Sequence, residues 1–159
     1  MGLLTQYPFR VLDWRSNNNI EWMQNNVAQL YNRVRQELGL RRNYRIEWVN
    51  LGDQPGRIDA PNGIIQLNQL RLVQATAATR HYILGVLIHE MRHAYQFEAV
   101  NSPGLFPHVS LATRTAWARR FHSDWPGAQP PYYTMVLRDY FWQSVEWDAH
   151  APGLRGHRR

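Results

Sequence analysis

The amino-acid sequence predicts an α+β fold in which a small antiparallel sheet of about three strands packs on a long central helix, with helices near both termini. Apolar residues recur every three or four positions before and after residues 44–68, which is typical of helices, whereas side chains alternate within 44–68, which is typical of strands. With 159 residues, of which 44% are hydrophobic, the chain can bury the core of one domain. We therefore expect a single domain over residues 1–159, with an arm at 1–15 and a basic tail at 154–159.

Four segments carry the helical pattern. The first covers residues 20–38. Ser16 or one of the asparagines at 17–19 can cap this helix, and Gly39 follows it, as glycine often does at a helix end. The second covers residues 79–99 and stops before a Ser-Pro-Gly sequence, because proline cannot continue a helix. Two further helices are expected at 110–123 and 132–150.

Three short segments carry the strand pattern. They lie at residues 44–51, 57–60 and 64–68, and they are rich in the residue types that favour strands. Turns that contain glycine or proline separate them. Together these segments predict the antiparallel sheet.

The central helix contains the sequence His-Glu-Met-Arg-His at residues 89–93. Successive residues of a helix turn by about 100°, so His93 lies one turn beyond His89 on nearly the same side. Two imidazoles placed in this way can bind one Zn²⁺. Glu90 stands beside the first histidine, where its carboxylate can act as a general base on a metal-activated water. The apolar residues of the helix fall roughly opposite, so the metal-binding face and the core face are separate.

A catalytic zinc site needs a third protein ligand in addition to a water molecule. The last predicted helix offers Glu146, whose carboxylate can complete a set of two histidines and one glutamate. Asp148 and His150 on the same helix are the alternatives. Asp148 can instead accept a hydrogen bond from a ligand histidine and fix its tautomer. The sequence thus predicts one Zn²⁺ per chain, held by His89, His93 and Glu146.

Three segments resemble parts of small bacterial zinc metallopeptidases with the zincin fold. Residues 89–96 resemble their active-site helix, residues 143–149 resemble the helix that supplies a glutamate ligand in the gluzincin branch, and residues 63–68 resemble the edge strand that precedes the motif. The resemblance spans residues 44–151. It implies a zincin-like fold whose edge strand pairs with an extended substrate peptide. The residues to which it gives this role are Gly63, Ile64, Ile65, Gln66, Leu67 and Asn68.

The composition argues against several other kinds of site and partner. The chain has no cysteine, which excludes disulfides and thiolate metal sites. No apolar run is long enough to predict a membrane span, and residues 1–10 lack the pattern of a secretory signal. All 18 basic residues are arginine, and the net charge is +6. These arginines are scattered and no recognition motif accompanies them, so nucleic acid is not an expected partner.

The function that the sequence predicts is that of a zinc-dependent metalloendopeptidase, which hydrolyses peptide bonds in a protein or peptide substrate. It would be either a bacterial effector or toxin domain or a cytoplasmic regulatory protease. We expect it in the cytoplasm, or delivered by a route that needs no N-terminal signal peptide. One alternative is a zinc amide hydrolase that acts on a non-protein substrate such as a cell-wall peptide. Another is a non-catalytic module that binds zinc or nucleic acid.

Overall fold

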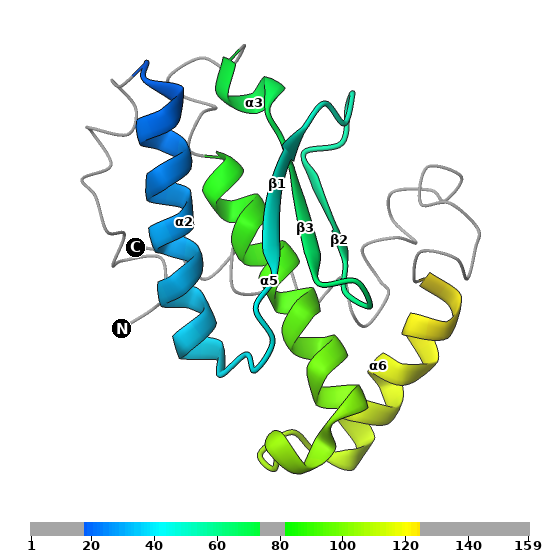
Figure 1. The fold of residues 1–159 in the computed structure, drawn as a ribbon. Helices are drawn as coiled ribbons and strands as arrows, with labels where there is room; N and C mark the ends of the chain where they lie inside the picture. The colour runs from blue at the N-terminus through cyan, green and yellow to red at the C-terminus, as the bar shows by residue number, and fades with distance from the viewer. Residues whose placement is uncertain (1–17, 74–81, 125–159) are drawn as a thin grey trace, which may run out of the picture.

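The computed structural model describes residues 18–73 and 82–124, which Figure 1 shows as a coloured ribbon. These residues form a three-stranded sheet and several helices, which confirms the predicted α+β class. The predicted arm at 1–15, the helix at 132–150 and the tail at 154–159 lie outside the described residues. In chain order the elements are α2 (Ile20–Leu38), β1 (Arg45–Val49), β2 (Gly56–Asp59), β3 (Ile64–Asn68), α3 (Leu70–Val73), α5 (Tyr82–Asn101), η2 (Pro103–Leu105) and α6 (Leu111–Asp124).

Both predicted ends of α2 are confirmed. The Asn19 side chain accepts a hydrogen bond from the backbone N–H of Trp22 at 3.0 Å, and this satisfies one of the donors left over at a helix N-terminus. At the other end Gly39 adopts a φ of 68°, a left-handed conformation that glycine reaches without steric cost. Its N–H bonds to the carbonyl of Gln36 at 3.2 Å, which closes the last turn.

The sheet is mixed, so the prediction of an antiparallel sheet is wrong. β2 and β3 form an antiparallel hairpin, but β1 pairs with β3 in parallel, from Arg45 opposite Ile64 to Val49 opposite Asn68. The strand order is β1-β3-β2. The chain reverses direction at each of its two turns, so the first and third strands point the same way. Because β3 lies between β1 and β2 in the sheet, it pairs directly with β1, and this pairing is parallel.

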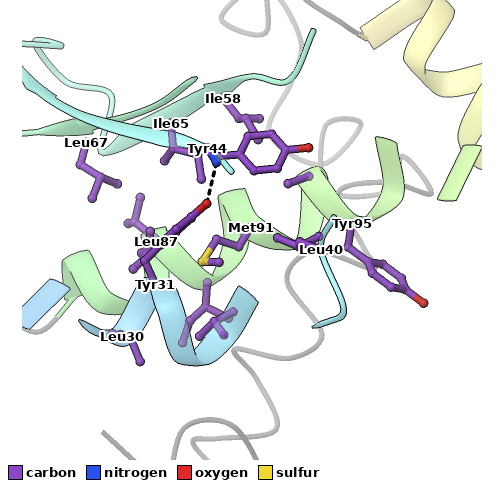
Figure 2. Close-up of a cluster of buried hydrophobic side chains, with 14 of the residues drawn as sticks. Leu30, Tyr31, Leu40, Tyr44, Ile58, Ile65, Leu67, Leu87, Met91 and Tyr95 are labelled. Atoms are coloured by element: carbon purple, nitrogen blue, oxygen red, sulfur yellow. Dashed lines mark hydrogen bonds between the residues drawn. The ribbon is translucent and has the colours of Figure 1, made fainter. Parts of the chain in front are cut away.

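The central helix α5 packs against α2 on one side and against the sheet on the other (Figure 1). In Figure 2, Leu87 and Met91 of α5 lie between Leu30 of α2 and the β3 residues Ile65 and Leu67. All five side chains are fully buried or nearly so. Their burial stabilises the three layers by the hydrophobic effect, about 1.5–3 kcal/mol for each large aliphatic side chain.

A buried carboxylate connects α5 to the segment between α2 and β1. Oε1 of Glu98 accepts hydrogen bonds from the backbone N–H groups of Arg41 at 2.7 Å and Arg42 at 3.4 Å. Oε2 accepts from the Tyr44 hydroxyl at 3.0 Å. Burial and the neighbouring Glu98 carboxylate raise the pKa of Tyr44 well above its ordinary value, so the phenol remains a donor. These bonds fix the C-terminal half of α5 relative to the start of the sheet.

A second phenol extends this network toward α2. The Tyr44 backbone N–H donates to the hydroxyl of Tyr31 at 2.6 Å, the bond drawn in Figure 2. The Tyr31 hydroxyl in turn donates to Oδ1 of Asn43 at 3.1 Å. Burial is the main cause that raises the pKa of Tyr31. Through Tyr31 and Tyr44 the network joins α2, β1 and α5, which are the elements that set the position of the histidine motif.

Candidate metal centre

The histidine motif lies in the middle of α5, on a helix as the sequence predicts. His89 and His93 are one turn apart and share a side of the helix. The apolar residues of α5 that enter the core, including Leu84, Leu87 and Met91, project on the opposite side. His89 is half-buried and His93 is only 5% exposed. The helix therefore presents two imidazoles away from the core while it keeps them largely shielded from solvent.

The two imidazoles meet through the nitrogens that most often bind metals. Nε2 of His89 and Nε2 of His93 are 3.1 Å apart, and the rings are almost perpendicular at 89°. Two nitrogens bound at about 2.0–2.1 Å to one tetrahedral zinc ion stand about 3.3 Å apart. The observed separation is close to this value, so the distance between the two nitrogens is compatible with two ligands of a single Zn²⁺.

Gln96 orients the second histidine. Its side chain is fully buried, and its Oε1 lies 2.9 Å from Nδ1 of His93. The sequence-based prediction of the site did not include Gln96. The signal that could have found it is the spacing: a residue three positions after a helical histidine can reach that histidine's outer nitrogen. The predicted partner for a ligand histidine, Asp148, lies outside the described residues.

Glu90 is next to His89 in the sequence, but its side chain leaves the helix in a different direction from the two imidazoles. It follows His89 by one residue, which turns its side chain by about 100° around the helix. The side chain is buried, with 7% of its surface exposed. A carboxylate at this position can accept a proton from a molecule bound beside the histidines without displacing either imidazole. A general base requires this arrangement.

The third ligand predicted from the sequence is not among the described residues. Glu146 and its alternative His150 both lie beyond residue 124, as does Asp148. Within residues 18–73 and 82–124, no group of three His, Asp or Glu side chains is placed to hold a metal ion. His89 and His93 are thus the part of the predicted site whose geometry the structure gives.

The predicted edge strand needs a correction. Residues 63–68 include β3, which is the central strand of the described sheet, with β1 on one side and β2 on the other. Both sets of its backbone hydrogen-bonding groups already face neighbouring strands, so it cannot pair with a further peptide. The prediction was wrong because alternation along a strand indicates its faces and not its neighbours.

β2 is an edge strand of the described sheet, and it approaches α5 on the side that carries the histidines. A Cβ atom at Gly56 would stand 2.6 Å from Cγ1 of Val86, so only glycine permits this close approach of β2 to the helix. Val86 lies one turn before Glu90 and two turns before His93, on the same side of α5. In Figure 1, β2 is the strand farthest from α2. Its outer edge is an edge of the sheet formed by the described strands.

Another histidine near α5 has a structural partner. Nε2 of His108 is 2.8 Å from the hydroxyl of Tyr95, and the Tyr95 ring makes edge contacts with Phe106 and Trp117. These contacts hold the segment after α5, and α6 beyond it, against the helix. His108 therefore belongs to the packing around Tyr95.

No protein-family model, curated protein sequence or solved structure matches this chain at a significant level. In the part of the chain that the structure describes, no helix combines the length and the apolarity needed to cross a bilayer. The function is therefore inferred from the residues and geometry of the chain itself.

Proposed function

We propose that this protein is a zinc-dependent metalloendopeptidase with a zincin-like arrangement of its motif helix and sheet. The observation that carries the proposal is the 3.1 Å separation of the two Nε2 atoms, with Glu90 one residue from the first of them. A pure metal-binding site does not need this carboxylate. A hydrolase does, because a group must accept the proton of the attacking water.

His89, His93 and Glu146 are the residues that would hold the zinc ion. When bound, zinc supplies a Lewis acid that lowers the pKa of a water molecule toward 7 and polarises a substrate carbonyl. Glu90 would accept the proton that this water loses and pass it to the departing amine. Its burial favours this role, because few bulk water molecules compete for the carboxylate oxygens.

The outer edge of β2 replaces β3 as the proposed site of substrate pairing. An extended peptide can add to a strand edge through backbone hydrogen bonds, which hold it without demanding a particular sequence. The contact between Gly56 and Val86 brings β2 to the side of α5 that carries Glu90 and His93. A peptide along this edge would therefore run past the motif, which favours a protein or peptide substrate.

Cleavage of peptides tests this function. The zinc-loaded full-length protein, incubated with a diverse mixture of proteome-derived peptides, is expected to generate new peptide termini detectable by mass spectrometry. A chelator should stop their formation, and added zinc should restore it. A His93→Ala variant prepared in the same way serves as the control for contaminating proteases. If the wild-type protein produces no termini beyond those of this control, the peptidase proposal fails.

A further inference from the structure

We infer that Gln96 is a positioning residue that fixes the tautomer of His93 and so prepares its Nε2 to bind metal. The inference deepens the proposed function and rests on it for its metal-binding part. It starts from the contact between Oε1 of Gln96 and Nδ1 of His93, at 2.9 Å. Gln96 has no exposed surface and His93 has only 5%, so this contact is shielded from water that could replace it.

The chemistry of the contact determines where the His93 proton lies. An amide oxygen can only accept a hydrogen bond, and a neutral imidazole carries its proton on one nitrogen alone. With the amide oxygen of Gln96 at this contact, Nδ1 of His93 is the protonated nitrogen. In the other tautomer, the lone pair of Nδ1 would face the lone pairs of Oε1 across 2.9 Å in a buried site, which is unfavourable.

The position of this proton determines the state of the second ring nitrogen, Nε2. With the proton on Nδ1, Nε2 of His93 carries the lone pair, and this nitrogen is the one that lies 3.1 Å from Nε2 of His89. A metal ligand needs such a lone pair, and an outer partner that fixes the tautomer commonly changes metal affinity about 10–100-fold. Gln96 thus acts through His93 and has no direct role toward substrate.

The helix explains why glutamine suits this position. Gln96 lies three residues after His93, and side chains at this spacing are neighbours on a helix surface. From there the side chain of glutamine places its Oε1 2.9 Å from Nδ1 of His93. Because the amide is neutral, it orients the imidazole without placing another negative charge in the buried site.

Two measurements test the inference, and the first needs no metal. In zinc-free wild-type protein with ¹⁵N-labelled histidine, nuclear magnetic resonance is expected to show the His93 proton on Nδ1. In a Gln96→Leu variant, which keeps the side-chain size but has no acceptor, this preference should be lost. A wild-type His93 that carries its proton on Nε2 would overturn the inference, whether or not the protein is a peptidase.

The second measurement is zinc affinity, determined by competition with a chelator. Gln96→Leu should bind zinc about 10–100-fold more weakly than wild type, whereas Gln96→Glu, which retains an acceptor, should restore the affinity to within about threefold. Gln36→Leu, at an exposed glutamine of α2, is the matched control and should bind as wild type does. Equal affinity in wild type and Gln96→Leu would overturn the inference even if both proteins cleave peptides.

Discussion

Replacement of Glu90 by Gln is expected to lower the rate of peptide hydrolysis by about 10²–10⁴-fold, because general acid–base catalysis contributes a factor of this size. The amide has nearly the same shape as the carboxylate, but it cannot accept the proton of the attacking water. Glu90 is not one of the proposed ligands, so zinc content should stay at the wild-type level. The measurements are initial rates on one cleaved peptide and the zinc content of the same samples.

A matched substitution separates the role of Glu90 from a general effect of lost charge. Glu37 lies on the exposed surface of α2, and Glu37→Gln should leave both rate and zinc content unchanged. The general-base role would be contradicted if Glu90→Gln hydrolysed the peptide at the wild-type rate. It would also be contradicted if the variant lost its zinc, because Glu90 would then act as a ligand.

Replacement of Glu98 by Ala is expected to lower the free energy of unfolding by about 3–5 kcal/mol. The variant would leave the Arg41 N–H and the Tyr44 hydroxyl without the buried carboxylate that accepts them at 2.7 and 3.0 Å, and each such bond is worth about 1.5–3 kcal/mol. Unfolding in urea, followed by tryptophan fluorescence, measures the loss. Because the network joins α2, β1 and α5, the effect should extend to the whole cooperative unit.

Two further variants show whether the loss comes from the network itself. Glu98→Gln keeps one acceptor oxygen and should lose only about 1–2 kcal/mol. Glu37→Ala removes an exposed glutamate and should change stability by less than about 0.5 kcal/mol. A Glu98→Ala variant as stable as Glu37→Ala would show that the buried bonds do not hold these elements together.

The helices were predictable because their signals are local. The ends of α2 depend on Asn19 and Gly39, each of which acts within a few residues of its own position, and the structure confirms both. The helical placement of the histidine motif was predictable for the same reason. The three strands were also located to within a few residues, since alternation of side chains is a property of each strand alone.

The order of the strands could not be predicted in this way. Which strand lies in the middle depends on contacts between residues far apart in the sequence, such as Arg45 with Ile64, and no alternation pattern contains that information. For this reason the prediction placed β3 at an edge, whereas β2 holds that place beside α5. The role of Gln96 was missed for a related reason: it depends on how two buried side chains meet, and several rotamers fit the same spacing.

The number of zinc ions bound per chain is the most direct test of the central proposal that His89 and His93 hold a catalytic metal. Native mass spectrometry of protein purified without added metal is expected to show about one zinc per wild-type chain and a large loss in His93→Ala, since a ligand is removed. His108→Ala, at the exposed histidine that contacts Tyr95, should keep its zinc. Loss of zinc in Glu146→Ala would identify the third ligand. A wild-type chain that binds no zinc even after zinc is added back, or a His93→Ala variant that retains it fully, would contradict the proposed metal centre.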